Sequence, residues 1–194
     1  MVESIRIGRA VSLDKVDTFA DGIKVGRASE RIRKILAPKM HRMLVADDEA
    51  MAAAVLTLME KAKIIAEGAC GLSLAVLPQI QNEIKGKKVV LMISGGNIDV
   101  NLLSRIIERG LIRAGRRLRV NALISDRPGS LAGLTELLAH QEANILQVIH
   151  DRDEPSTRID QTEVALTLET RGPDHSRGVI EALRDHCLRV TVIE

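Results

Sequence analysis

The spacing of apolar residues divides this chain into two parts, which meet at a stretch rich in glycine and arginine, residues 115–119. In the first part, most apolar residues recur every three or four positions, which is typical of helices that pack on one face. Helices are expected over residues 27–36, 47–59, 70–79 and 99–114, and a short strand over residues 43–45. The sequence therefore predicts two domains, residues 1–115 and residues 116–194.

One segment of the first part departs from the helical spacing. The five apolar residues of Val89–Ile93 follow one another between Gly86 and Gly95, and they predict a strand over residues 87–93. A continuous apolar run suits a central parallel strand that is covered on both faces. In α/β enzymes, ligands bind at the carboxyl ends of such strands, so the residues that follow this run are candidate ligand contacts.

The second part has the pattern β-α-β-β-α-β. Strands are expected over residues 118–124, 144–150 and 187–193, and Val164, Leu166 and Leu168 alternate with polar residues in a further strand. Helices are expected over residues 130–141 and from Pro173 onward. This order of elements is typical of a ferredoxin-like fold, and the fold class of the chain is α/β.

Composition and charge argue against several classes of protein. The formal net charge is only +2, so no strong electrostatic field attracts the chain to nucleic acid or to a membrane surface. Phe19 is the only aromatic residue, which argues against stacking on single-stranded bases. No run of about 18 apolar residues and no signal-peptide core is present, so no membrane partner is expected.

The cysteines and histidines give no sign of a metal site. Cys70 and Cys187 are far apart in sequence and lie in apolar surroundings, and no Cys-x-x-Cys pair occurs. The five histidines lack the spacing of metal ligands. We interpret the two thiols as reduced and structural, which favours a cytoplasmic protein.

Three short segments offer candidate ligand contacts in the first domain. In the turn Ser94-Gly95-Gly96-Asn97, the glycines allow a ligand close to the backbone, Ser94 offers a hydroxyl group, and Asn97 suits a helix N-cap. Glu67 precedes a turn of small residues, where its carboxylate could contact a ligand ring or a substrate amine. Gly22 lies in a turn that could line a pocket. Spacing alone leaves an ordinary capped turn between strand and helix equally open.

The second domain has one candidate site for an amino-acid effector. The turn from Asp126 through Gly129 to Ser130 joins a strand to a helix, and free backbone N–H groups at such a turn can bind a carboxylate. Asn144 is expected to face this turn from the start of the next strand. The alternative is an ordinary turn that binds nothing.

Several of these segments resemble successive sequence blocks of the threonine dehydratases, which are also called threonine ammonia-lyases. The matching segments are Val16–Ile23, Ala66–Ala69 and Ile93–Asp99, and Leu102–Leu111 continues the likeness. The stretch after residue 116 resembles an ACT domain, a small-molecule-sensing module that is fused to many such enzymes. The resemblance implies part of a pyridoxal phosphate domain of type II fold, similar to tryptophan synthase β, followed by an ACT regulatory domain.

The resemblance also implies a chemistry and a set of roles. The family uses pyridoxal phosphate to eliminate water from threonine or serine, and hydrolysis of the eliminated product releases ammonia and a 2-oxo acid. Ser94 would hydrogen-bond the pyridine nitrogen of the cofactor, Glu67 would be a carboxylate close to it, and Gly22 a backbone position beside it. Gly95 and Asn97 belong to the same loop as Ser94 and are included among the cofactor contacts.

One departure from the family pattern limits what the chain is expected to do. The family's Schiff-base lysine, its Ser-x-Gly-Asn-His loop and its glycine-rich phosphate cradle lie upstream of the matched segments, and these 194 residues do not contain them. We therefore expect no catalytic residue, no deamination of threonine and no retention of the cofactor by this chain alone.

Two alternatives to a lyase segment remain open from the sequence. One is a non-catalytic ACT regulator that binds an amino acid and forms a homo-oligomer through its ACT domains. The other is a remnant of an enzyme without a function of its own.

Overall fold

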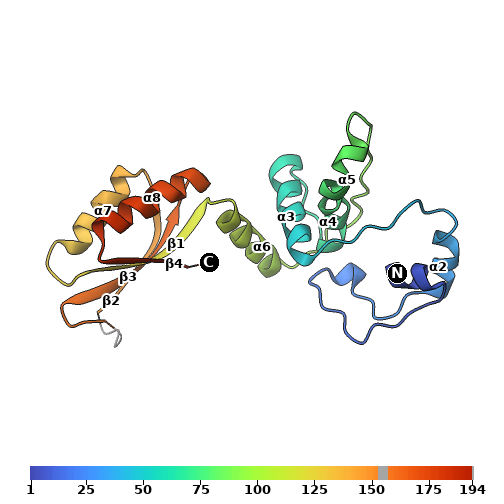
Figure 1. Cartoon of the computed structure of the whole chain (residues 1–194), viewed down its shortest axis with the longest axis horizontal. Helices are drawn as coiled ribbons and strands as arrows, with labels where there is room; N and C mark the ends of the chain where they lie inside the picture. Colours follow the sequence, from blue (N-terminus) through green and yellow to red (C-terminus); the bar gives the residue numbers. More distant parts are fainter. Residues whose placement is uncertain (153–156, 194) are drawn as a thin grey trace. The chain divides into compact units, whose positions relative to one another are not determined.

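Two compact units, Met1–Ile106 and Ile107–Glu194, make up the computed structural model of this chain (Figure 1). The structure describes residues 1–152 and 157–193. The division between the units falls inside a helix, α6 (Val100–Arg113), ahead of the glycine/arginine stretch at residues 115–119. None of the described helices is long and apolar enough to span a membrane.

The first unit is built from helices joined by extended segments. Its helices before α6 are α1 (Val2–Ile7), the 3-10 turn η1 (Asp21–Ile23), α2 (Glu30–Leu36), α3 (Asp48–Thr57), the π-helical turn η2 (Leu58–Ala62), α4 (Gly68–Ala75) and α5 (Leu77–Ile84). The helix expected over residues 70–79 is two helices, because Pro78 lies in the first turn of α5 and starts a new segment.

The contact between α3 and α4 forms the centre of the first unit. Asp47 begins α3 as its N-cap, since its side chain accepts a hydrogen bond of 2.8 Å from the backbone N–H of Ala50. Met51 and Val55 are buried on the face that meets α4. A Cβ atom at Gly71 would lie 2.9 Å from Cγ2 of Val55, so the glycine permits the two helices to approach closely.

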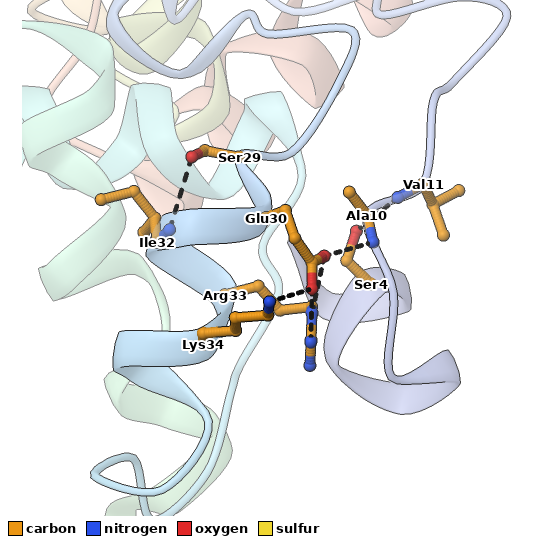
Figure 2. Close-up of polar contacts among 8 residues, drawn as sticks. All are labelled: Ser4, Ala10, Val11, Ser29, Glu30, Ile32, Arg33 and Lys34. Carbon is orange, nitrogen blue, oxygen red and sulfur yellow. Dashed lines mark hydrogen bonds and ion pairs between the residues drawn. The ribbon is translucent and has the colours of Figure 1, made fainter.

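Polar contacts connect the two short helices near the N-terminus (Figure 2). The hydroxyl of Ser4 in α1 accepts a hydrogen bond of 3.0 Å from the backbone N–H of Val11. Glu30, at the start of α2, accepts a hydrogen bond of 2.8 Å from the N–H of Ala10 and is paired with Arg33, one turn further on, at 2.6 Å. Glu30 therefore joins α2 to the segment that follows α1.

The strands predicted at residues 43–45 and 87–93 are absent from the first unit as the structure describes it. Both segments lie outside regular secondary structure. The only β-pairing among the described residues of this unit is the isolated bridge between Ser12 and Arg27. Within the apolar run, Val90 is 92% exposed and Met92 is 75% exposed. A strand exists only where a neighbouring backbone pairs with it, and no such neighbour lies beside residues 87–93 within the described chain.

The second unit is a four-stranded antiparallel sheet with two helices on one face (Figure 1). Its elements are β1 (Arg117–Ser125), α7 (Ser130–His140), β2 (Asn144–Asp151), β3 (Gln161–Glu169), α8 (Pro173–His186) and β4 (Arg189–Val192), and the strand order is β2-β3-β1-β4. All six elements lie close to the ranges expected from the sequence.

The core of this unit is aliphatic and lies between the sheet and the helices. Alternate residues of β1 and β3 point into it, including Val120 and Val164, and the helices contribute residues that are fully buried. The helix residues are Leu134, Leu138, Val179 and Leu183. Because the strands show this period-two alternation in the sequence, their faces could be assigned from the pattern alone.

Gly115 ends α6 in a conformation that its surroundings fix. Its φ of +60° is in the left-handed region, and a Cβ atom at this position would lie 2.6 Å from the backbone N of Pro173. Its carbonyl oxygen accepts hydrogen bonds from the hydroxyls of Thr170 at 2.7 Å and Ser176 at 2.9 Å. The predicted Gly/Arg hinge is thus held in place at its first residue.

Candidate functional site

Glu67 lies at the start of α4, where the backbone changes from extended to helical. Its carbonyl oxygen accepts hydrogen bonds from the backbone N–H groups of Cys70 at 3.0 Å and Gly71 at 3.2 Å, which form the first turn. Its side chain is half-buried. The carboxylate lies against the backbone of two glycines from other segments, Gly22 and Gly95.

Gly22 and Gly95 lie near opposite ends of the first unit's sequence, and the lack of a side chain at each leaves room for the Glu67 carboxylate. A Cβ atom at Gly22 would lie 3.0 Å from Oε1 of Glu67, and one at Gly95 would lie 2.7 Å from its Cδ. Any side chain at either position would therefore displace the carboxylate. Three of the residues proposed as cofactor contacts, Gly22, Glu67 and Gly95, thus meet at one place.

The segment before Gly22 is fixed by the start of α3. Both oxygens of the Asp48 carboxylate accept hydrogen bonds, from the hydroxyl of Thr18 at 2.6 Å and from the backbone N–H of Phe19 at 3.1 Å. The ring of Phe19 lies over Gly68, where an added Cβ atom would be only 2.5 Å from Cε2 of the ring. These contacts bring η1, which contains Gly22, to the start of α4.

The loop that contains Ser94 is held to the same helix. The backbone N–H of Gly95 donates a hydrogen bond of 2.9 Å to the sulfur of Cys70, and its carbonyl accepts one of 3.2 Å from the N–H of Glu67. Ser94 itself is exposed. Its hydroxyl, which can donate or accept a hydrogen bond, is therefore presented to solvent next to Gly95, the glycine that lies against the Glu67 carboxylate.

Asn97 does not cap the following helix as the sequence suggested. The side chain of Asp99 accepts hydrogen bonds from the N–H groups of Asn101 at 2.9 Å and Leu102 at 3.0 Å, so Asp99 is the capping residue of α6. The turn closed by the N–H of Ile98 and the carbonyl of Gly96 moves the helix start beyond Asn97, whose side chain is exposed.

These residues bring together groups of the kind that contact organic ligands. Glu67 supplies a carboxylate, Ser94 a hydroxyl, and Gly22 and Gly95 supply backbone without side chains to obstruct a ring. Among the described residues, no group of three histidine, cysteine, aspartate or glutamate side chains is arranged to hold a metal ion. The donor set present suits hydrogen bonding to a flat ring and an amine.

In the second unit, two cavities flank the turn between β1 and α7. One, of about 310 Å³, is lined by the turn together with His150, Arg152 and Thr162. The other, of about 390 Å³, is lined by the same turn together with Gly133, His186 and Leu188. Asp126, Gly129 and Ser130, the predicted effector contacts, belong to this turn, and all three line the first cavity.

One backbone N–H group of the turn already has a partner, since that of Ser130 donates to the carbonyl oxygen of Arg127 at 3.2 Å. Gly129 immediately precedes α7 and has a φ of +92°. This left-handed conformation turns the chain from the loop into the helix. The Asp126 carboxylate accepts hydrogen bonds from Nη2 of Arg152 at 2.6 Å and from its Nε at 3.1 Å. Both members of this ion pair line the smaller cavity, and of the two only Arg152 was not indicated by the sequence.

Asn144 does not face this turn, so the prediction that it does was wrong for a single copy of the chain. It pairs with Glu169 in β3, whose other neighbour is Arg117 at the start of β1, and its side chain donates to the Glu169 carboxylate at 3.3 Å. The turn follows Ser125 at the opposite end of β1. The antiparallel register therefore places His150 and Arg152, at the far end of β2, beside the turn.

The first 95 residues match the family described as pyridoxal-phosphate dependent enzyme. The L-threonine ammonia-lyase of Thermotoga maritima is 39% identical over 184 residues, which are 94% of this chain and 45% of that enzyme. The L-threonine ammonia-lyase of Geobacter sulfurreducens is 37% identical over 181 residues, which are 93% of this chain and 45% of that enzyme. The chain therefore spans about half the length of these curated relatives.

A solved structure gives the same indication. The processed form of threonine deaminase isoform 2 from Solanum lycopersicum aligns with a TM-score of 0.51 and 26% identity, over 55% of this chain and 32% of that one. The chain is thus related to the pyridoxal-phosphate dependent enzymes. Within that class it is similar to the threonine ammonia-lyases, and the resemblance to that family stated from the sequence is confirmed, whereas the resemblance to an ACT domain stays a prediction.

Proposed function

We propose that this chain supplies part of the cofactor-binding domain of a threonine ammonia-lyase, which converts L-threonine to 2-oxobutyrate and ammonia. The observation that carries the proposal is the meeting of Gly22, Glu67 and Gly95 at the start of α4. All three lie within the segment that matches the pyridoxal-phosphate dependent enzymes. The similarity to L-threonine ammonia-lyases supports threonine as the substrate.

The residues of this chain would act on bound pyridoxal phosphate by positioning it. When bound, the cofactor supplies an electron-withdrawing ring that stabilises negative charge on the substrate's α-carbon. Ser94 would hydrogen-bond the ring nitrogen, and because a serine hydroxyl is neutral it leaves that nitrogen largely unprotonated. Gly22 and Gly95 would let the ring approach the backbone, with the Glu67 carboxylate at its edge. Asn97 would lie at the exposed end of the same loop.

We further propose that activity requires a segment that these 194 residues do not contain. The resemblance places the lysine that holds the cofactor in this family upstream of the matched segments, and the relatives are about twice as long as this chain. The exposure of Val90 and Met92 supports this, because an apolar run of that kind is normally covered in a folded enzyme. The missing part would supply both that cover and the opposite wall of the site.

A complementation experiment tests the proposal. The chain would be assayed for 2-oxobutyrate alone and after co-expression with the part of the Thermotoga maritima enzyme that precedes the matched region. We expect no product from the chain alone and product from the pair, with Ser94→Ala lowering the rate of the pair. Product from the chain alone would refute the need for a further segment. A co-purifying pair that binds the cofactor but makes no 2-oxobutyrate from threonine would refute the lyase assignment.

We propose as a second function that the unit formed by residues 107–194 is a ferredoxin-like ACT domain that binds an amino acid at the turn between β1 and α7. The two cavities beside Gly129 and Ser130 are large enough for such a ligand and lie at the start of a helix. Asp126 and Arg152, which pair with each other at 2.6 Å, place one charge of each sign in the lining of the smaller cavity.

Titration calorimetry of the whole chain with isoleucine, valine and threonine tests this second function. Saturable binding is expected without cofactor, and Gly129→Pro should abolish it because proline cannot adopt a φ of +92°. Gly8→Pro is the matched control, since Gly8 also has a positive φ but lies in the first unit. Equal binding by both variants would place the site elsewhere, and no binding by the parent chain would refute the function.

The same unit is proposed to form a homo-oligomer. β2 and β4 lie at the two edges of the sheet, and their outer backbone groups are available to a second copy. Leu146 and Ile149 on β2 are exposed apolar residues of the kind that an interface covers. Light scattering that gives the mass of a monomer at all concentrations tested would exclude this proposal.

A further inference from the structure

We propose that Gly95 is a positioning residue that fixes the Ser94 hydroxyl relative to the Glu67 carboxylate, and that Cys70 is the group that holds it there. This inference rests on the proposed function for its meaning in catalysis. The contacts that carry it are present in the chain itself and can be tested without any cofactor.

Gly95 is hydrogen-bonded to the first turn of α4 on both sides of its α-carbon. Its N–H donates to the sulfur of Cys70 at 2.9 Å, and its carbonyl accepts from the N–H of Glu67 at 3.2 Å. Each backbone polar group of Gly95 thus has a partner on one helical turn. Two bonds to one rigid element restrict both the position and the rotation of the peptide units around Gly95, including the one that joins it to Ser94.

Apolar packing supports the same arrangement. Cys70 belongs to a buried cluster with Leu58 and Ala66, and Ile93, which directly precedes Ser94, packs against that cluster. Ser94 is therefore flanked by one residue that is packed against α4 and another that is hydrogen-bonded to it. The exposed serine lies on a segment fixed at both ends rather than on a free loop.

The absence of a side chain at Gly95 completes the arrangement. A Cβ atom there would lie 2.7 Å from Cδ, 2.8 Å from Oε1 and 3.0 Å from Oε2 of Glu67. All three distances are shorter than or at the limit of real contacts, so alanine at this position would push the carboxylate away. Gly95 consequently sets the separation between the carboxylate and the loop, in addition to any contact with a ligand.

Amide hydrogen exchange in the 194-residue chain tests the bond to Cys70. In Cys70→Ala the N–H of Gly95 loses its acceptor, and we expect it to exchange about three- to tenfold faster, as suits the loss of one hydrogen bond. Cys70→Ser retains an acceptor and should restore most of the protection. Cys187→Ala, which removes the other cysteine, should leave Gly95 unchanged. Unaltered exchange at Gly95 in Cys70→Ala would overturn the proposal.

Increased exchange at Val55 in α3, which packs against α4, would show that Cys70→Ala loosens the packing of α4 as a whole. A second variant tests the proposal in that case. Gly95→Ala should shift the side-chain carboxylate resonance of Glu67, while Gly178→Ala, whose added Cβ meets open space in α8, should not. An unchanged Glu67 resonance in Gly95→Ala would overturn the proposal.

The same variants separate this inference from the lyase assignment. In the complemented pair, Gly95→Ala should lower kcat more than it raises KM, because it displaces groups without removing a substrate contact. Altered exchange and carboxylate resonances in a pair that never makes 2-oxobutyrate would support the positioning role and refute only the lyase assignment.

Discussion

The hydroxyl of Thr18 and the carboxylate of Asp48 form a hydrogen bond of 2.6 Å between the loop before η1 and the first residue of α3. The second oxygen of the same carboxylate accepts from the N–H of Phe19, so one side chain fixes two successive residues. This contact determines where the following turn, and with it Gly22, meets the start of α4.

Asp48→Ala should release that loop. Both donors lose a charged acceptor, and we expect the free energy of unfolding of the first unit to fall by about 1.5–3 kcal/mol for each bond that water does not replace. The free energy of unfolding of Asp48→Asn, which retains one acceptor oxygen, should lie between those of the parent and the alanine variant. Urea unfolding followed by the amide signals of Met51 and Val55 measures the change. Equal stability of all three proteins would contradict the assigned role of the carboxylate.

Gly68→Ala should disturb the packing of the only aromatic ring. The added Cβ would lie 2.5 Å from Cε2 of Phe19 and 3.2 Å from the backbone Cα of Ala20, so either the ring or the loop must move. We expect a loss of about 1–3 kcal/mol in the stability of the first unit. Gly26→Ala is the control, because its added Cβ meets only the carbonyl of Leu13 at 3.9 Å. Equal stability of Gly68→Ala and Gly26→Ala would show that the ring and the loop accommodate the added Cβ with no loss of stability.

Glu30 should make the packing of α2 sensitive to acid. Hydrogen bonding from Arg33, opposed by desolvation and aided by the N–H of Ala10, lowers the pKa of Glu30 from 4.5 to about 2 (Figure 2). Because the pKa is lower in the folded chain, the stabilisation is complete above pH 4.5 and is lost as the pH falls toward 2. The amide resonance of Ala10 should follow this titration.

Variants at Glu30 provide the control for that titration. Glu30→Gln cannot titrate, so the acid-dependent shift at Ala10 should disappear and the contact with Arg33 should be weak at every pH. In Glu181→Gln, a change at an exposed position of α8, the amide resonance of Ala10 should shift with pH as it does in the parent. Persistence of the full shift in Glu30→Gln would assign the titration to a different carboxylate.

Cys187 should react slowly with alkylating reagents while the chain is folded. Burial raises the pKa of its thiol, which reduces the fraction of reactive thiolate at a given pH. The inflection in a plot of alkylation rate against pH should therefore lie higher in the folded chain than in urea, as mass spectrometry of the Cys187 peptide would measure. Identical inflections would show that the thiol is not shielded.

Leu134→Ala should weaken the second unit alone. Leu134 is fully buried between α7 and the sheet, and removal of its side chain should lower the free energy of unfolding by about 2–5 kcal/mol. Because the two units have separate cores, the amides of Val164 and Leu166 should lose protection, whereas those of Met51 and Val55 should not. Loss of protection in both sets would mean that the units unfold together.

The second unit could be predicted from its sequence because each of its elements carries a local pattern. Val164, Leu166 and Leu168 alternate with polar residues, and all three point into the core as expected. The partner of each strand lies within the same unit, so nothing outside it was needed. Asn144 was misplaced because spacing along a strand does not reveal which end of the sheet meets a turn; only the register with Glu169 does.

The first unit was harder to predict for a different reason. The apolar run around Val90 has the composition of a central strand, but a strand needs a neighbouring backbone that the described residues do not provide. The contacts among Gly22, Glu67 and Gly95 could be suspected from the family resemblance, whereas the part played by Cys70 could not. No spacing rule links a cysteine to an amide that lies 25 positions further along the chain.

The solitary ring of Phe19 against Gly68 has a practical optical consequence. With no tryptophan and no tyrosine, the chain contributes almost no absorption or fluorescence of its own in the near ultraviolet. A cofactor that absorbs or fluoresces in the near ultraviolet, taken up by this chain or by a complemented pair without tryptophan and tyrosine, would therefore be seen against a dark background. Its spectrum would report directly on whether the groups of Ser94 and Glu67 hold a chromophore.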